Sequence, residues 1–166
     1  MSSIVLIGFM GAGKTTVGKE LVKKGFELID TDAYIEACEK MSISDIFAQK
    51  GEDYFRQAET TALKTLLAQD KQFVISCGGG MPLREENRKL LKKLGMVVYL
   101  RIKPETVLAR LKGDTTRPLL KVDDSGERVR TLMQQREAHY LSGADFVLDV
   151  DQKTPEELAE EIFKEF

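Results

Sequence analysis

Three observations predict an α/β fold with a parallel sheet and helices on both of its faces. Short apolar segments rich in β-branched residues alternate with amphipathic helical stretches along the chain, and this alternation is typical of parallel sheets covered by helices. The first apolar segment runs straight into a glycine loop, as a buried parallel strand does. The chain has 166 residues, which fits one domain with a full hydrophobic core.

Five segments are predicted to be strands: 3–7, 26–29, 73–77, 96–100 and 146–150. One helix is expected directly after the glycine loop, and further helical stretches lie at 52–67, 85–94, 104–111 and 127–141. A last helix begins after Thr154. The run Thr154-Pro155-Glu156-Glu157 combines a capping hydroxyl, a proline in the first turn and a glutamate three residues after the threonine.

Two stretches interrupt the alternation of strands and helices. Residues 42–70 form a long insertion with a helical pattern between the second and third predicted strands. Residues 112–125 are polar, contain glycine, proline and aspartate, and show no periodicity. A loop of that length inside a compact domain is usually functional or disordered, so the second stretch is a candidate lid.

Charge and composition exclude several classes of protein. Lys and Arg number 25 against 27 Asp and Glu, a net charge of −2. Because there is no excess of basic residues to neutralise phosphates, we do not expect nucleic-acid binding. No apolar run is long enough for a membrane span, and the first residues lack the positive charge of a secretory signal. Cys38 and Cys77 lie far apart without metal-binding spacing, which predicts reduced, partly buried cysteines in a cytoplasmic protein. With no long apolar seam, we expect a monomer.

The glycine loop carries the clearest chemistry. The segment Gly8-Phe9-Met10-Gly11-Ala12-Gly13-Lys14-Thr15 fits G-x-x-x-x-G-K-[ST] between a predicted strand and a predicted helix. Glycines let successive N–H groups converge on phosphate oxygens, and the N-terminus of the following helix adds unsatisfied donors. Lys14 would reach the β and γ phosphates of ATP or GTP, and the Thr15 hydroxyl would ligate Mg²⁺. The expected nucleotide-binding residues here are Gly11, Ala12, Gly13, Lys14, Thr15 and Thr16.

Two aspartates follow the second predicted strand, on the edge where open α/β sheets bind ligands. Asp30 and Asp32 are spaced by two, and in extended backbone both side chains would point the same way. Like charges that close need a cation or a hydroxyl donor between them. We therefore assign Asp30 to the Mg²⁺ site and Asp32 to the acceptor hydroxyl, as its orienter and candidate base. The alternative for Asp32 is a helix N-cap.

A second glycine run and three arginines complete the candidate site. Gly78-Gly79-Gly80 follows the third predicted strand and allows close approach of a small polar ligand; the alternative is a flexible turn. That strand ends without the aspartate common at this position, which leaves the metal to Asp30. Arg117 in the candidate lid could stabilise the transferred phosphoryl group, and arginine forks at Arg56 and Arg136 suit a carboxylate. Taken singly, each arginine fits a solvated surface charge better, because arginine is mostly exposed and surface ion pairs contribute little.

Taken together, these motifs show that the chain resembles the shikimate kinase family over essentially its full length. Several separate motifs match in one order, and the phosphate loop continues as Thr16-Val17-Gly18, with Thr15-Thr16 where many members have Ser-Thr. The other matching pieces are Asp30-Thr31-Asp32, Ser44-Asp45-Ile46-Phe47, Gly51-Glu52 with Phe55-Arg56 and Glu59, Gly78-Gly79-Gly80, Arg117-Pro118-Leu119, and Arg136 with Tyr140.

The resemblance implies ATP-dependent phosphorylation of the 3-hydroxyl of shikimate, in the pathway to chorismate and the aromatic amino acids. It implies a three-layer P-loop kinase fold with a five-stranded parallel sheet in the order 2-3-1-4-5, a substrate-binding insertion at about residues 31–62 and a lid at about 112–125. Shikimate would be bound by Asp32, Arg56, Gly78, Gly79, Gly80 and Arg136, the two arginines holding its carboxylate.

For the nucleotide, the resemblance implies that Asp30 and Thr15 serve Mg²⁺ and that Arg117 contacts the ATP phosphates. Arg110 could assist, and adenine is expected near Arg110 and the turn that contains Lys153. With Lys14 and Asp32, Arg117 makes up the expected catalytic set. Binding of two anions by a chain of slight negative charge must then rest on local cations.

Two alternatives to this function remain at the level of sequence. One is a related kinase with another small acceptor, such as gluconate or a nucleoside monophosphate. The other is a regulatory module that only senses ATP. A sensor needs no second ligand pocket, whereas Asp32, Arg56, the glycine run and Arg136 resemble a pocket for a small hydroxy acid.

Overall fold

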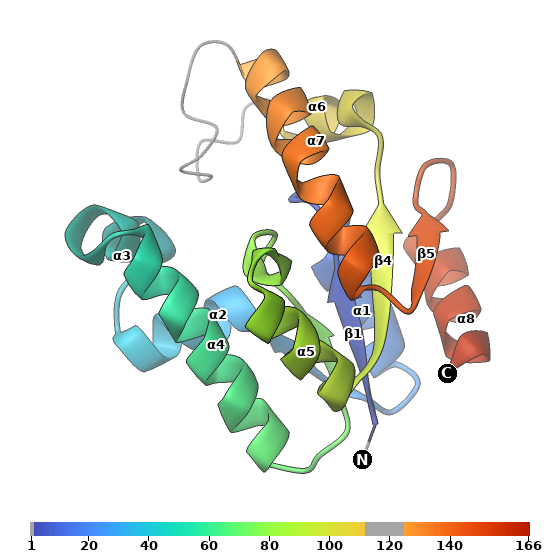
Figure 1. Ribbon diagram of the computed structural model, residues 1–166. Helices are drawn as coiled ribbons and strands as arrows, with labels where there is room; N and C mark the ends of the chain where they lie inside the picture. The colour runs from blue at the N-terminus through green and yellow to red at the C-terminus, as the bar shows by residue number, and fades with distance from the viewer. Residues whose placement is uncertain (1, 112–124) are drawn as a thin grey trace.

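The protein is described here from a computed structural model, which places residues 2–111 and 125–166 (Figure 1). The predicted lid falls almost wholly on residues 112–124, outside the described residues. Arg117 falls there too, so both remain predictions from the sequence.

Five parallel strands form one sheet in the order β2-β3-β1-β4-β5, as the family resemblance implies. Strand β1, with every residue buried, occupies the centre, which explains its continuous apolar sequence. The second strand begins and ends one residue later than predicted. The strands are β1 (Ser3–Ile7), β2 (Glu27–Asp30), β3 (Phe73–Ser76), β4 (Gly95–Arg101) and β5 (Phe146–Asp149).

Helices lie on both faces of the sheet, which confirms the predicted three-layer α/β architecture. In Figure 1, α5 (Glu85–Leu94) and α7 (Ser125–Gly143) cover the face toward the viewer. On the other face α1 (Lys14–Val22) packs beside α8 (Pro155–Glu165). Helix α6 (Pro104–Leu111) follows the carboxyl end of β4. Thr154 caps α8 through the predicted capping box with Glu157.

The segment between β2 and β3 projects from the side of the sheet as three helices (Figure 1). These are α2 (Thr31–Glu39), α3 (Ile43–Lys50) and α4 (Glu52–Ala68). They enclose a small apolar cluster of their own, made of Ile35, Ile46, Phe55 and Ala62. Full burial of a side chain as large as Ile46 contributes about 1.5–3 kcal/mol relative to exposure. The helices therefore have an apolar cluster of their own, while Leu63 and Leu66 of α4 join the main core, which surrounds β1.

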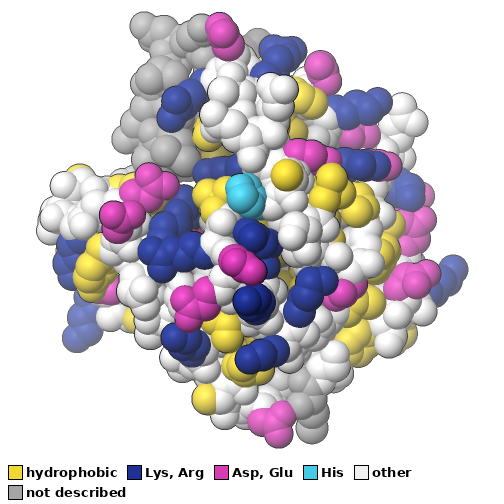
Figure 2. Space-filling model, viewed as in Figure 1, with side chains coloured by type: hydrophobic (Ala, Val, Ile, Leu, Met, Phe, Trp, Pro, Cys, Tyr) yellow, Lys and Arg dark blue, Asp and Glu magenta, His cyan; other side chains and the backbone are white. Residues whose placement is uncertain are grey.

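Three further features bear on the composition of the chain. Both cysteines are free; Cys77 is buried, but Cys38 is exposed on α2, so its predicted partial burial is wrong. Across the described residues, no helix is both long and apolar enough to cross a membrane. Lys and Arg side chains lie interspersed with Asp and Glu over the face seen in Figure 2, as expected from the balanced composition.

Candidate active site

A cleft of about 510 Å³ opens beside the glycine loop, at the carboxyl ends of the central strands. Parallel α/β sheets bind their ligands at this edge. Its lining includes the whole of the loop from Met10 to Val17 and, from distant parts of the chain, Asp30, Asp32, Ser76, Cys77, Gly78, Gly79, Arg110, Val150, Lys153, Pro155 and Leu158.

The loop has the geometry of a phosphate cradle. Gly13 has a φ of 89° and immediately precedes α1, a conformation that residues with a Cβ rarely adopt. Helix α1 begins at Lys14, so its unsatisfied N–H groups and the positive end of its dipole face the cleft. The Lys14 ammonium is buried and donates to the carbonyls of Gly8 (2.8 Å) and Phe9 (3.0 Å). It is held directly over the cradle.

Three oxygen-bearing side chains meet beside Lys14. The Thr15 hydroxyl donates to Asp30 Oδ2 at 3.1 Å and lies 3.1 Å from the Ser76 hydroxyl. Parallel pairing of Asp30 with Ser76 across β2 and β3 produces this proximity. Hydroxyl and carboxylate oxygens are the donors that Mg²⁺ accepts, and this ion needs only one or two protein ligands besides phosphates and water. The residues present therefore fit the predicted magnesium site.

The two aspartates after β2 differ in conformation from the prediction. Asp30 is the N-cap of α2, and its Oδ1 accepts from the N–H of Ala33 at 3.1 Å. Asp32 lies in the first turn of that helix, so the extended backbone assumed for this pair is wrong. The cap predicted as an alternative for Asp32 belongs to Asp30 instead. Asp30 and Asp32 both line this cleft and its neighbour.

Arg110 and Lys153 both line the cleft beside the glycine loop. The Arg110 guanidinium donates to the carbonyl of Gly11 at 2.7 Å. Lys153, which precedes α8, forms an ion pair at 3.0 Å with Glu161 of that helix. The structure therefore brings both residues to the phosphate loop, although they come from opposite ends of the second half of the chain.

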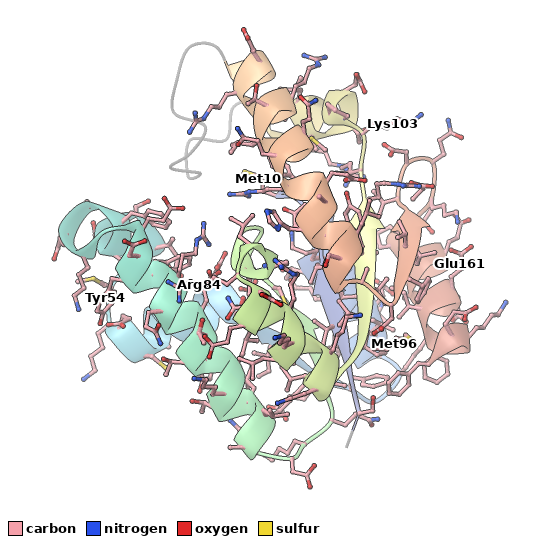
Figure 3. All side chains as sticks on the ribbon, in the orientation of Figure 1. Met10, Tyr54, Arg84, Met96, Lys103 and Glu161 are labelled. Carbon is pink, nitrogen blue, oxygen red and sulfur yellow. The ribbon has the colours of Figure 1, made fainter. Side chains whose placement is uncertain are left out.

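A second cleft, of about 610 Å³, lies between the glycine run, α7 and the helices α2–α4. Met10, labelled in Figure 3, lies between α7 and these helices. Five residues, Met10, Asp30, Asp32, Gly78 and Gly79, line both clefts. The second cleft is further lined by Ala33, Glu36, Ser42, Ile43, Ser44, Phe47, Phe55, Arg56, Glu59, Gly80 and Arg136.

Gly79 and Gly80 lie in a turn, in which the Met81 N–H donates to the Gly78 carbonyl at 3.1 Å, and the glycines of the run also allow close approach of charged groups. A Cβ on Gly80 would lie 2.4 Å from the Arg56 guanidinium nitrogens. A Cβ on Gly78 would lie 2.7 Å from Asp32 Oδ1 and 3.3 Å from Glu59 Oε2. Real Cβ atoms do not come that close to other heavy atoms, so charged groups of the second cleft can surround the run only because side chains are absent there.

Arg56 is buried, at 7% exposure, and is held by two glutamates of α4. Its Nη1 donates to Glu59 at 2.9 Å and its Nη2 to Glu52 at 3.4 Å. Glu59 is fully buried, and burial raises its pKa to about 7 although the positive charge of Arg56 opposes the shift. Within the described residues Glu59 Oε2 has no hydrogen-bond partner.

Arg136 is buried as well, at 4% exposure. Its guanidinium lies over the Phe9 ring at 5.7 Å from the centroid, and 3.3 Å from where a Cβ on Gly79 would be. Arg56 and Arg136 are thus both buried in the lining of the second cleft, and the surface-charge alternative is wrong for them. Within the described part of the chain, no carboxylate forms an ion pair with Arg136, whereas Arg56 has two.

Residue reasoning missed two members of the site. The Ser76 hydroxyl is hydrogen-bonded to that of Thr15. The feature of the sequence that could have indicated this role is the position of Ser76 at the end of the third strand, where phosphate-loop proteins commonly have an aspartate. Glu59 was seen only as part of a family motif; its spacing of three from Arg56 on a predicted helix is the signal that would have paired them.

Two clefts that meet at a carboxylate suit a protein that brings a nucleoside triphosphate and a small acceptor together. In combination with the phosphate loop and the sheet order, they define the class of P-loop kinases that act on small molecules.

Comparison with known proteins identifies the member of this class. A sequence profile of the shikimate kinase family matches residues 10–166. A shikimate kinase of Thermodesulfovibrio yellowstonii is 48% identical over 100% of this chain and 95% of its own length. The shikimate kinase of Acinetobacter baumannii, solved in complex with shikimate, superposes with a TM-score of 0.93 at 38% identity, covering 99% of this chain and 92% of that one. That of Aquifex aeolicus has a TM-score of 0.82 at 37% identity, covering 98% and 94%.

The chain belongs to the shikimate kinase family. Its activity is that of a shikimate kinase, in the pathway to the aromatic amino acids.

Proposed function

We propose that the two clefts divide the substrates between them: ATP lies along the glycine loop and shikimate lies between the glycine run, α4 and α7. The observation that carries this assignment is the shared rim, where Asp32, Gly78 and Gly79 line both clefts. A phosphoryl group can pass directly only where donor and acceptor meet. The relative from Acinetobacter baumannii that was solved with shikimate supports the identity of the acceptor.

In the second cleft, Arg56 and Arg136 hold the carboxylate of shikimate and Asp32 faces its 3-hydroxyl. Two planar guanidinium groups on either side of the glycine run can grip a carboxylate by charge-assisted hydrogen bonds. Because both are buried, their charges are poorly screened by water and act strongly on an anion. Asp32 accepts the hydroxyl proton or its hydrogen bond and so directs the oxygen toward the phosphate.

In the first cleft, Lys14 and the N-terminus of α1 stabilise negative charge on the phosphates throughout the transfer. We assign Thr15 and Asp30 to Mg²⁺, because the Thr15 hydroxyl donates to Asp30 Oδ2 at 3.1 Å and lies 3.1 Å from the Ser76 hydroxyl, so that these oxygens meet beside the phosphate loop. Bound Mg²⁺ would supply further neutralisation of phosphate charge. Arg110 and Lys153 extend the nucleotide site away from the acceptor, and Arg117 stays a further catalytic residue predicted from the sequence.

We further infer that residues 1–166 act as one P-loop kinase domain in which 31–62 form the substrate-binding insertion, and that the protein is a cytoplasmic monomer. The separate apolar cluster beneath α2–α4 supports the insertion as a distinct unit. Light scattering of the purified protein with and without its substrates tests the monomer.

The assignment of the acceptor hydroxyl is tested by ADP release coupled to product analysis. Purified enzyme is given Mg-ATP with shikimate, gluconate or a nucleoside monophosphate in parallel, and the product is examined by ¹H–³¹P NMR. We expect ADP release with shikimate alone, and phosphorus coupling to the proton on carbon 3. Turnover of gluconate or a nucleotide, or coupling to another ring proton, contradicts the proposed acceptor geometry; ATP binding without any acceptor turnover would support the sensor.

A further inference from the structure

Tyr140, on α7, reaches the glycine run from the side opposite the insertion. Its side chain is 1% exposed, and its hydroxyl donates to the carbonyl of Gly79 at 2.7 Å. It follows Arg136 by one helical turn, so both side chains lie on the same face of α7. The helix therefore makes two contacts with the run, one through a charged side chain and one through a hydroxyl.

The hydrogen bond to Gly79 also fixes the next N–H group. The peptide bond between Gly79 and Gly80 is trans, so its C=O and N–H point in opposite directions. Holding the carbonyl toward Tyr140 turns the Gly80 N–H away from α7. Among the described residues this N–H has no acceptor, and Gly80 lines the second cleft with the Arg56 guanidinium against it.

Tyr140 is built to remain a donor in a fixed position. Burial raises its pKa to about 12, although the nearby positive charge of Arg136 opposes the shift, so the hydroxyl keeps its proton near neutral pH. Its ring packs on that of Tyr99 with centroids 5.0 Å apart. The Tyr99 hydroxyl in turn donates to Glu137. The stacked pair leaves the Tyr140 hydroxyl little freedom to choose another acceptor.

We propose that Tyr140 is a positioning residue for shikimate binding: it holds the Gly79–Gly80 peptide in the orientation in which the N–H of Gly80, already expected among the shikimate-binding residues, faces the carboxylate beside Arg56 and Arg136. This inference rests on the proposed acceptor cleft. Glycine is the one residue type that could approach the Arg56 guanidinium so closely, and glycine is also the residue whose peptide orientation is least restricted. The turn bond from the Met81 N–H to the Gly78 carbonyl at 3.1 Å closes the run but does not set the direction of its central peptide, between Gly79 and Gly80. Tyr140 holds the carbonyl of that peptide.

Tyr140→Phe tests the proposal, with Tyr99→Phe as the matched control. Each variant keeps its ring and loses one buried hydroxyl with one hydrogen bond, but only Tyr140 bonds to the run. We expect Tyr140→Phe to raise the KM for shikimate about tenfold, the effect of one misplaced hydrogen bond to a charged group, with the KM for ATP within about twofold. Tyr99→Phe should change neither KM. An unchanged shikimate KM in Tyr140→Phe, or an equal rise in both variants, overturns the proposal.

Two further measurements separate this inference from the cleft assignment on which it rests. With a shikimate analogue that carries a hydroxymethyl group in place of the carboxylate, Tyr140→Phe and wild type should have the same KM; a penalty that persists overturns the role. If Arg136→Ala also leaves the KM for shikimate unchanged, the cleft assignment itself is wrong, and the inference falls with it.

The wild type offers a test that does not depend on the folding of a variant. In protein labelled with ¹⁵N-glycine, shikimate should shift the Gly80 amide proton downfield, as expected when an N–H begins to donate to a carboxylate. A non-hydrolysable ATP analogue alone should not produce this shift. A Gly80 resonance that is unmoved by saturating shikimate contradicts the proposal.

Discussion

The two halves of the active site are built from different materials. The longest continuous part of the lining of the nucleotide cleft is the stretch Met10 to Val17, which offers backbone N–H groups and a helix terminus. The acceptor cleft takes its charges from α2, α4 and α7, which are far apart in sequence. Backbone donors recognise any phosphate chain, whereas a few side chains at fixed positions select one small acid. We therefore expect the acceptor cleft to determine which small molecule this enzyme phosphorylates.

The halves also differ in how their cations are balanced. Lys14 is held by carbonyl oxygens of its own loop, and Arg56 is held by two glutamates. Arg136 forms no ion pair with a carboxylate among the described residues. A buried cation without a carboxylate partner is unfavourable unless a ligand supplies the anion. We therefore expect Arg136 to be the position at which the proposed acceptor cleft depends most on a bound anion.

The sharpest test of the comparison is a substitution at Asp32, one of the residues that line both clefts. Asp32→Asn should lower kcat by about 10²- to 10⁴-fold, because the hydroxyl loses its general base or its orienting charge, while ATP binding persists. Steady-state kinetics and calorimetric titration with a non-hydrolysable ATP analogue measure the two. Asp45→Asn, in the exposed first turn of α3, is the control. A kcat close to that of wild type would remove Asp32 from the mechanism.

Lys14→Ala breaks the nucleotide half alone. We expect kcat/KM for ATP to fall by about 10²- to 10³-fold, the loss typical of removing one group that stabilises charge in the transition state. Shikimate binding measured without nucleotide should be retained. Lys19→Ala, exposed on the same helix, should behave as wild type. Normal use of ATP by the Lys14 variant would refute the phosphate-loop assignment.

Glu59 gives the acceptor half a pH dependence of its stability. The folded protein holds the Glu59 proton more tightly than the unfolded chain, since its pKa rises from 4.5 to about 7. This group therefore lowers the free energy of unfolding as pH rises from about 4.5 to about 7, by about 3 kcal/mol in total. Urea unfolding should show Glu59→Gln gaining that much on wild type between about pH 5 and pH 7.5.

Glu52→Gln is the matched control for this measurement, because Glu52 pairs with the same Arg56 while its side chain is 58% exposed. Its stability should follow that of wild type with pH. If the free energy of unfolding of Glu59→Gln, like that of Glu52→Gln, differs from that of wild type by an amount that does not change with pH, the Glu59 carboxyl does not titrate in the expected range.

Arg136→Ala breaks the acceptor half alone. Removing one charged donor to the carboxylate should raise the KM for shikimate by about 10- to 100-fold, with kcat and the KM for ATP changed much less. Arg130→Ala, on the same helix with its side chain 53% exposed, is the control. A KM for shikimate that stays at the wild-type value would show that Arg136 does not bind the acceptor.

The same comparison explains what the sequence could predict. The phosphate loop was predictable residue by residue, because all its donors lie in one segment with a known backbone requirement. The place of Asp30 and Asp32 at the carboxyl end of β2 was predictable, but their conformation was not. Aspartate is a good N-cap at either position, and only the residue at which α2 begins decides which of the two caps the helix. The burial of Arg56 and Arg136 could not be predicted, since it depends on how α4 and α7 pack around the glycine run.

Tyr140 illustrates the limit from the other side. The family motif pairs it with Arg136, but nothing local in the sequence distinguishes a tyrosine that packs in the core from one that bonds to a distant carbonyl. Only the fold brings α7 to the run that follows β3. Positioning residues of this kind are accessible from structure rather than from motifs.

The smallest effects should come from two helix caps, one at each cleft. The Ser42 hydroxyl caps α3 by accepting from the N–H of Asp45 at 3.1 Å, and the Thr154 hydroxyl caps α8 by accepting from that of Glu157 at 3.1 Å. Replacing either by alanine should lower the free energy of unfolding by about 1 kcal/mol.

Ser42 lines the acceptor cleft, and Thr154 lies beside Lys153 and Pro155 of the nucleotide cleft. The two variants should therefore lose similar stability but differ in which KM rises. Ser42→Ala should raise mainly the KM for shikimate and Thr154→Ala mainly that for ATP, each by a few-fold at most. Each variant is thus the control for the other. If both variants changed the same KM, the two clefts would not be separate binding sites, and the division of substrates between them would have to be abandoned.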